Sequence, residues 1–451
     1  MAIENKINTV TLHDDHTIYS REWSFLRDAM RGNTIIKNKG EFYLPYPSNL
    51  PKDVNKSLTD SYYAKFLKLT DFPDLTKQSA NSMKGLISSG ESTIDNLPSS
   101  LDNDSFKNYV INTYHQVMSE CLVVGRNGLL IEVVDNAIGL DLKTYTTENI
   151  ENWHTEDDKI VFAVLRQSVP ILKDDGVSYD YDNFNHLILK LVDGVYTQEL
   201  RNNDFEVIDI ITPTFKGTTF DFIPFYILTP TKINDEVANS PLSPIASLCL
   251  HIYRNTAIWN KSIATKGDPT LTLFGFENDE LERLSSGANN IIASSNTQAS
   301  ARFLEMDTGT EFIKDKIMFD TQTAQAYAGK LLDTGNSGVE SGQSLKQRRL
   351  TAEISLKSIV TTISKQMTTI LQDFTNKYGY DDYLTVVFNG FDEFSAKIQD
   401  VDDLLKASGL IINGIVSKKT IHARATELGI TDSSFEDEEK DIQDEKDIEL
   451  A

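Results

Sequence analysis

SLKQRRLTAEISLKSIVTTISKQMTTILQDFTNKY, residues 344–378, is the longest helical pattern in this sequence. Its apolar residues recur at steps of mostly three and four, so one face of the helix is buried and the other is polar. At 1.5 Å per residue the helix would be about 50 Å long, which is far above the usual length. The pattern therefore predicts a long structural strut. Its apolar positions are 345, 350, 354, 356, 359, 360, 363, 367, 370, 371 and 374.

The segment that precedes this helix, DTGNSGVESGQ at residues 333–343, is polar and rich in glycine, and cations follow it closely. One interpretation is a flexible loop at the end of a strut that contacts a rod-shaped polyanion such as DNA without reading its sequence. The other is an ordinary helix connection with basic residues on a solvated face. The sequence leaves both open. The candidate contact residues are Thr334, Gly335, Asn336, Ser337, Gly338, Gln343, Lys346, Arg348 and Arg349.

Residues 243–332 contain two further helical patterns that flank a β segment. The first helix is expected from Ser243 to about Lys266, because Ser243 is a good cap and Pro244 suits the first turn. A strand is expected at 270–274, followed by a segment rich in Gly, Ser and Asn. A short second helix is expected from Thr321 to Leu332.

The N-terminal half reads as helices followed by an antiparallel sheet, which makes the fold class α+β. Cys121–Val134 contains two apolar runs around Asn127-Gly128, and this pattern predicts a β-hairpin. The expected helices are Glu22–Arg31, Ser61–Leu69 and Phe106–Met118. The other expected strands are Ile160–Leu165, His186–Val192, Phe205–Ile211 and Phe222–Leu228.

At the C-terminal end, Ser417 is expected to cap a helix that runs to Glu427, with Gly429 closing it. The last twenty residues are almost all charged and predict a solvated helix or a disordered tail. Such a tail either docks a partner or keeps the chain in solution.

The composition limits the function classes. The chain has 67 acidic residues and 43 Lys and Arg, a formal net charge of −24. It is therefore not a plain DNA-coating protein, which would need clustered cations. Its two cysteines have no metal-like spacing and favour a reducing compartment. No signal peptide or membrane span is recognised, so we expect a protein made in a cytoplasm that stays there or in a particle assembled there.

Motifs for catalysis are not found in the sequence. There is no P-loop, no nucleophile elbow and no H-E-x-x-H pair. His13-Asp-Asp-His16 is interpreted as a solvated loop, and Asp381-Asp382 as a surface turn. We therefore expect no enzyme activity, no cofactor and no metal.

A series of short patterns occurs in a fixed order over residues 20–430. They are Trp23 with Arg27-Asp-Ala-Met-Arg-Gly32; Tyr43-Leu-Pro45; Tyr62, Tyr63, Phe66 and Leu67; Val124-Gly-Arg-Asn-Gly128; Tyr145-Thr-Thr-Glu-Asn-Ile-Glu-Asn-Trp153; Val161-Phe-Ala-Val-Leu-Arg166; Ser243-Pro-Ile-Ala-Ser-Leu248; Tyr253-Arg254; Asp268-Pro-Thr-Leu271 and Gly275; Phe303-Leu-Glu305 and Gly309; the Ala-rich stretch 324–332; and Gly414 with Ser417 to Thr420.

In this order the patterns resemble the portal, or head-to-tail connector, proteins of tailed bacteriophages. More narrowly, they resemble a branch long described as a family of unknown function. Lys68-Leu-Thr70 departs from the resemblance, since an Arg-Ala pair is expected there, and the region before residue 20 matches no pattern.

The resemblance implies a portal-like subunit with a mixed wing, a helical stem, a small α/β clip and a helical crown. It divides the chain into an N-terminal wing region at 1–242, a stem helix at 243–266, a clip at 267–318, a second stem helix at 319–332 and a tunnel loop at 333–343. A long wing helix with its following strand occupies 344–394, and a crown-like region with the acidic tail occupies 395–451.

The resemblance also implies a function: a ring of twelve or so copies at one capsid vertex that passes DNA during packaging and ejection. The implied partners are double-stranded DNA, terminase, tail adaptors, capsid and scaffolding proteins, without a membrane. The implied location is the virion, and the host cytoplasm during assembly. An acidic channel suits this role because tight phosphate contacts would stall DNA. The alternatives are another structural virion component, such as an adaptor, and a metal-dependent nucleic-acid enzyme.

Overall fold

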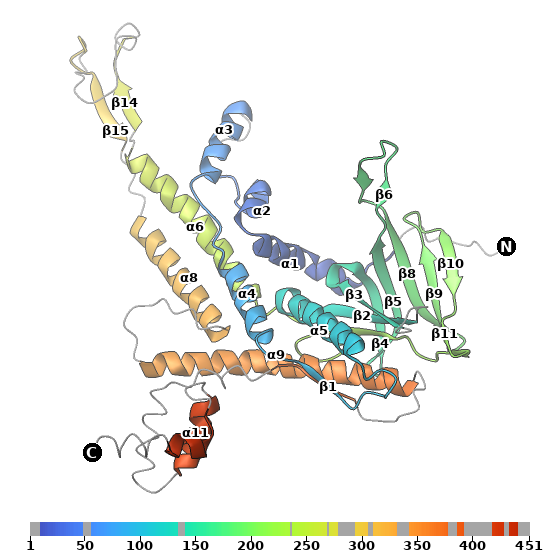
Figure 1. Cartoon of the computed structure of the whole chain (residues 1–451). Helices are drawn as coiled ribbons and strands as arrows, with labels where there is room; N and C mark the ends of the chain where they lie inside the picture. The colour runs from blue at the N-terminus through green and yellow to red at the C-terminus, as the bar shows by residue number, and fades with distance from the viewer. Residues whose placement is uncertain are drawn as a thin grey trace, which may run out of the picture. The chain divides into compact units, whose positions relative to one another are not determined.

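A computed structural model of the chain shows an α+β fold (Figure 1). The chain divides into two compact units, residues 1–82 with 112–336 and residues 83–111 with 337–451. The structure describes residues 10–47, 56–133, 140–234, 237–267, 270–277, 294–304, 310–331, 342–377, 386–391, 417–427 and 433–440.

The first unit contains a five-stranded antiparallel sheet with the strand order β10-β9-β8-β5-β4. The predicted strands of this region are confirmed, and apolar residues fill the buried positions at the centre of β5 and β8, whereas β10 is exposed along its length. Two hairpins of two-residue strands, β6–β7 and β11–β12, extend from this part of the chain. The bounds are β4 Ile150–Glu156, β5 Lys159–Ser168, β6 Ile171–Leu172, β7 Tyr179–Asp180, β8 Phe184–Val192, β9 Val195–Arg201, β10 Val207–Ile211, β11 Thr214–Phe215 and β12 Thr218–Thr219.

A three-stranded sheet, β13-β2-β3, shows that the hairpin predicted at 121–134 is wrong. Helix α5, Asp104–Val124, includes the first apolar run, and β2, Asn127–Val133, is a single strand that begins at the predicted turn. Both apolar runs are buried, so they consist of the same kinds of residue and look alike in the sequence. Gly128 is needed for close packing rather than for a turn, because a Cβ there would lie 2.7 Å from the Phe225 ring. The neighbouring strands are β3 Leu140–Thr146 and β13 Phe225–Leu228.

The N-terminal helices are α1 Asp14–Arg31, α2 Asn33–Asn38, α3 Lys56–Leu67 and α4 Leu75–Ile87, with a short 3-10 turn at Gly40–Phe42. Helix α1 begins eight residues before the predicted start at Glu22. The solvated loop expected at 13–16 is therefore wrong: His13 is the N-cap, and its Nδ1 accepts a hydrogen bond from the Asp15 amide at 3.2 Å. Asp14 and Asp15 also suit the positive end of the helix dipole.

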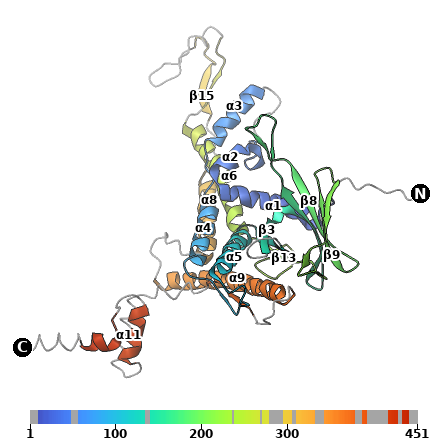
Figure 2. The same cartoon turned by 45° about the vertical axis from the view of Figure 1, so that its right-hand side comes forward.

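Helices α6, Ser243–Gly267, and α8, Thr310–Leu331, pack side by side in the first unit, as Figures 1 and 2 both show. The helix predicted from Ser243 is confirmed. Helix α8 begins eleven residues before the predicted start at Thr321, because most of its large apolar residues are exposed and do not mark a buried face. A hairpin of β14, Thr270–Phe274, and β15, Ser300–Leu304, lies beyond the end of α6 (Figure 1).

The second unit is built on α9, Gly342–Lys377, which confirms the predicted strut to within two residues at its start and one at its end. A two-stranded antiparallel ladder joins β1, Thr93–Asp95, to β16, Val387–Asn389. Of the predicted apolar positions, 356, 360, 363, 367, 370, 371 and 374 are buried.

Helix α11, Lys418–Glu427, is capped as predicted, since the Ser417 hydroxyl accepts from the Thr420 amide at 3.2 Å. Part of the acidic tail, residues 435–440, is helical.

Candidate functional site

The candidate DNA-contacting residues fall mostly outside the part of the chain that can be described. Thr334, Gly335, Asn336, Ser337 and Gly338 lie outside the described residues, as does Asp381-Asp382. The set at 334–349 therefore stays a prediction. Its other members, Gln343, Lys346, Arg348 and Arg349, occupy the first turns of α9.

Their place on α9 is informative about charge. Lys346, Arg348 and Arg349 are the fifth, seventh and eighth residues of α9. They lie beyond its first turn, where the helix dipole has little effect, and they give this end of the helix a local positive charge in an acidic chain. Positions 343, 346 and 349 recur every three residues and so lie along one side of the helix.

The seam between α6 and α8 is lined by small residues. Ala257 on α6 and Ala324 and Ala328 on α8 are buried, which lets two helices approach closely. Asp320 lies four residues before Ala324 on the same side of α8 and is also buried. It forms an ion pair with Lys316, one turn earlier. The two helices thus form a closed pair on their shared side.

The outer surface of the same pair is apolar. Phe312 is 82% exposed and Phe319 is 62% exposed on α8, and Ile258 is 47% exposed on α6. Ile263 and Met318 are also exposed. Exposed side chains of this size on both helices make the outside of the pair a candidate contact surface.

Helix α6 is fixed to the N-terminal helices by hydrogen bonds along its first two thirds. The hydroxyl of its first residue, Ser243, donates to Glu22 Oε1 at 2.6 Å, and Arg254 Nε donates to the Tyr43 carbonyl at 2.7 Å. Asn260 donates to the Leu69 carbonyl at 2.5 Å. Tyr43 belongs to one of the short patterns quoted from the sequence, and so does Arg254, so two distant patterns meet here.

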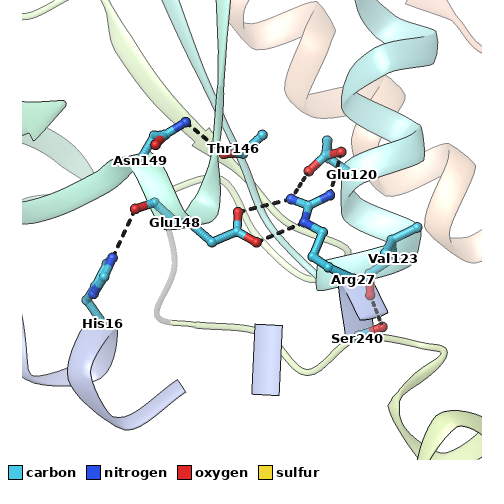
Figure 3. Close-up of polar contacts among 8 residues, drawn as sticks. All are labelled: His16, Arg27, Glu120, Val123, Thr146, Glu148, Asn149 and Ser240. Carbon is cyan, nitrogen blue, oxygen red and sulfur yellow. Dashed lines mark hydrogen bonds and ion pairs between the residues drawn. The ribbon is translucent and has the colours of Figure 1, made fainter. Parts of the chain in front are cut away.

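Residues from two other quoted patterns are in contact in the cluster around Arg27 (Figure 3). Its Nε and Nη2 donate to Glu148 at 2.8 and 3.0 Å, and its Nη1 and Nη2 donate to Glu120 at 2.9 and 2.5 Å. Burial opposes the charge of Arg27, but the hydrogen bonds from both glutamates outweigh it and raise the pKa of the guanidinium. Burial likewise opposes the Glu148 charge, yet Arg27 holds the pKa of Glu148 below its usual value.

This cluster joins α1, α5 and the turn before β4, so it fixes the N-terminal helix to the sheets. Sequence reasoning did not predict the contact. The signal was nevertheless there, because Arg27 and Glu148 both lie in quoted patterns, as do Arg126 and Trp153.

Arg126 is fully buried and lies flat on Trp153, with its guanidinium carbon 3.8 Å from the ring centroid. His13 stacks at the same centroid distance, 3.8 Å, so the indole is sandwiched between the two side chains. Among the described residues, none of the three guanidinium nitrogens has a hydrogen-bond partner. Burial lowers the pKa of Arg126 to about 9.

A pocket of about 510 Å³ lies between α9 and β16 in the second unit. Its hydroxyl groups are already engaged: Ser364 accepts from the Gly390 amide at 3.1 Å, and Thr368 accepts from the Phe388 amide at 2.9 Å. These bonds attach the strand to the helix, so the polar lining has a structural role.

Within the described ranges, no group of three or more His, Cys, Asp or Glu residues is placed to hold a metal ion. In the same ranges, no helix has the length and apolar character needed to cross a membrane.

Residues 241–377 match a family model described as "Domain of unknown function (DUF4055)". This match covers α6, the β14–β15 hairpin, α8 and α9. No curated protein matches the chain.

Three solved structures show a weak likeness. The first, "Virion of native gene transfer agent (GTA) particle", has a TM-score of 0.39 at 12% identity and covers 81% of this chain and 92% of its own. "Neck of empty GTA particle computed with C6 symmetry" has a TM-score of 0.38 at 10% identity and covers 88% and 98%. "Neck of native GTA particle computed with C12 symmetry" has a TM-score of 0.36 at 10% identity and covers 81% and 92%.

Proposed function

We propose that this chain is a non-enzymatic phage portal subunit, which forms a ring at one capsid vertex and provides the channel for DNA packaging and ejection. The observation that carries the proposal is the α6–α8 pair, which is closed along its inner seam and apolar on its outside. Side chains such as Phe312 and Phe319 on α8 need a partner, and the exposed Ile258 and Ile263 on α6 of a second copy supply an unlike apolar patch for them. Rings close through such head-to-tail contacts when the rotation fits.

The order of elements supports the same reading. A helix, a small β-hairpin and a returning helix are followed by a long strut, which is the order that the portal resemblance implies for stem, clip, stem and wing. In this proposal α6 and α8 are the stem, β14–β15 belongs to the clip, and α9 is the wing helix. The clip would end near residue 309 rather than 318, because α8 begins at Thr310.

In this proposal the segment 333–343 and the first turns of α9 line the channel and contact the DNA that passes through it. A net charge of −24 discourages tight phosphate binding. Lys346, Arg348 and Arg349 would then guide the duplex without holding it. The proposed partners are double-stranded DNA, terminase, tail adaptors, capsid and scaffolding proteins; the proposed location is the virion vertex, with the host cytoplasm during assembly.

The test is native mass spectrometry of the full chain with negative-stain electron microscopy, alone and with scaffold and capsid protein. We expect a ring of about twelve copies with an axial hole wide enough for duplex DNA, roughly 20 Å or more. Phe319→Asp should abolish the ring while leaving the folded subunit intact, because that side chain is exposed. Lys314→Asp, at an exposed position about 140° around the same helix from Phe319, is the matched control. A chain that stays monomeric even with scaffold and capsid present contradicts the proposal, and chelator-sensitive nuclease activity would replace it.

A further inference from the structure

The pocket between α9 and β16 is bounded on the helix by two rows of side chains. One row, Ser364 and Thr368, accepts hydrogen bonds from the strand and attaches it to the helix. The other row is Thr361, Lys365 and Thr369, which recur every four residues and so lie along one side of α9. Attachment of the strand does not use this second row, so its presence in the pocket calls for another explanation.

The second row combines a cation with a hydroxyl group. Lys365 is exposed, and within the described ranges its ammonium group has no ion-pair partner. The Thr361 hydroxyl likewise has no hydrogen-bond partner there, whereas Thr369 donates to the Lys365 carbonyl at 3.1 Å. Val387 adds a half-buried apolar surface to the same lining. A cation and a hydroxyl beside an apolar surface suit a carboxylate that is carried next to an aliphatic side chain.

The charges around Lys365 leave the pocket positive. One turn away in both directions, this side of α9 has only threonines; two turns away, it has Lys357 before and Asp373 after. On the strand side, Asp95 of β1 accepts from the Asn389 amide group at 2.8 Å. Helix α9 as a whole has six Lys and Arg and two Asp and Glu, in a chain of net charge −24. An acidic ligand is therefore expected.

The acidic tail of this chain contains a short repeat. Glu-Lys-Asp-Ile occurs at 439–442 and again at 445–448, in a segment, 432–449, that has ten Asp and Glu and two Lys. Each repeat places a carboxylate directly before an isoleucine. A spacing of six residues would put both repeats on the same side of an extended chain, because side chains alternate with a period of two. Isoleucines that recur in this way are not needed for solubility, so the repeat indicates recognition.

The start of the tail leaves its charges unused. It belongs to the same compact unit as the pocket. Phe435 contacts the His422 ring of α11 edge-on, with the ring centroids 5.4 Å apart. Glu436 and Glu439 are exposed, and in the part of the chain that the structure describes neither forms an ion pair. The tail thus meets α11 through an aromatic ring, and its carboxylates remain available for another cationic surface.

We propose that the pocket lined by Thr361, Lys365 and Val387 is a peptide site for the acidic tail of the same chain, and that one Glu-Lys-Asp-Ile repeat occupies it. The aspartate accepts from the Lys365 ammonium group and the Thr361 hydroxyl, and the isoleucine packs on Val387. Two repeats raise the effective concentration of the motif. The inference does not depend on the ring, because the pocket and the tail belong to one chain.

Acetylation of lysines in the full chain, followed by mass spectrometry, tests the contact in place. The comparison is with a full chain in which Asp441→Asn, Ile442→Ser, Asp447→Asn and Ile448→Ser are combined. If the tail occupies the pocket most of the time, Lys365 should react about fivefold more slowly in the wild type than in this variant. Lys77, exposed on α4, is the internal control and should react equally in both. Equal reactivity of Lys365 in the two chains overturns the proposal.

Binding of a labelled peptide of residues 432–451 to the same variant provides an independent measurement. Lys365→Glu, at an exposed position, should keep the unfolding temperature and weaken binding about tenfold. Lys77→Glu changes the net charge by the same amount and should have no effect. An equal loss in both variants shows attraction by net charge alone and overturns the pocket assignment. A loss with Lys419→Glu but not with Lys365→Glu assigns the tail to α11 and also overturns it, as does a peptide that does not bind.

Discussion

The sheet region around Arg27 and the helix pair α6–α8 differ in where their apolar and charged groups lie. Around Arg27, the guanidinium and the carboxylates of Glu120 and Glu148 satisfy one another within a single chain, and Trp23 on the same helix is buried. In the helix pair, small residues face inward and phenylalanines face water. The first region buries its apolar side chains within one copy, whereas the second leaves large apolar side chains exposed. Mutations should therefore affect subunit folding in the first region and assembly in the second.

The largest expected effect is at Trp23, which is 1% exposed. Trp23→Ala should lower the free energy of unfolding by about 3–5 kcal/mol, because it leaves a large cavity in the core. Urea unfolding of the subunit, kept dilute so that it stays monomeric, is the measurement. A loss below about 1 kcal/mol would mean that the sheet region does not depend on its own core.

Glu148→Gln should cost about 2 kcal/mol, because it removes charge-assisted hydrogen bonds to Arg27. It should also change the pH dependence of stability. The pKa of Glu148 is lowered in the fold, so its contribution is complete above the unfolded value near 4.3 and is lost as pH falls through the lower folded value.

Thermal unfolding of both proteins between about pH 7 and pH 3 measures this effect. The wild type should lose more stability than Glu148→Gln as the pH falls. Glu156→Gln, at an exposed position on β4, is the control and should follow the wild type. Equal acid sensitivity of Glu148→Gln and the wild type would show that the pair contributes no free energy.

Arg126→Met should be neutral or stabilising by about 1–2 kcal/mol at pH 7, because it removes a buried charge that has no hydrogen-bond partner among the described residues. The sign with pH follows from its pKa of about 9 in the fold. The unfolded chain holds the proton up to higher pH, so wild-type stability should rise above pH 9, and that rise should be reduced in Arg126→Met. A loss of several kcal/mol in the variant would show that stacking on Trp153 outweighs desolvation.

The smallest effect on the subunit is expected at Phe319. Phe319→Ala should change its free energy of unfolding by less than about 0.5 kcal/mol and still weaken the ring. Denaturant unfolding of the dilute subunit and native mass spectrometry of the concentrated protein give the two values. A subunit destabilised as strongly as Trp23→Ala would remove the contrast between the two regions.

The contrast also explains what the sequence could predict. Helix α9 was predicted almost to its ends because its apolar residues recur at steps of mostly three and four from 345 to 374. Helix α8 was predicted eleven residues short because Phe312 and Phe319 point to water and break the pattern. Such a helix is incomplete without its partner, and a single sequence does not contain that information.

The hairpin predicted at 121–134 failed for a different physical reason. Four consecutive buried residues, 121–124, end a helix, and the next apolar run begins a strand. Periodicity cannot separate two fully buried runs. Gly125, whose φ is +84°, makes the break, and a Cβ there would lie 2.4 Å from the Ala238 carbonyl oxygen.

For the site, the sequence identified the residues that meet but not their pairings. Three separate patterns contain these residues: one has Arg27, one has Arg126, and one has both Glu148 and Trp153. Contacts between residues 121 positions apart nevertheless depend on the whole fold. The cations at 346–349 were placed on the correct helix, and their contact with DNA stays a prediction.

The hydrogen bonds that attach α6 to the N-terminal helices end at Asn260, seven residues before the helix does. The last part of α6 is thus a cantilever of about 10 Å, braced by α8 and carrying β14–β15 at its free end. A push on the hairpin exerts a torque about Asn260, and the reaction force falls on the Leu69 and Tyr43 carbonyls. In the proposed ring each subunit would carry such a lever, and a load on its β14–β15 hairpin would be transmitted through α6 to the Tyr43 and Leu69 carbonyls.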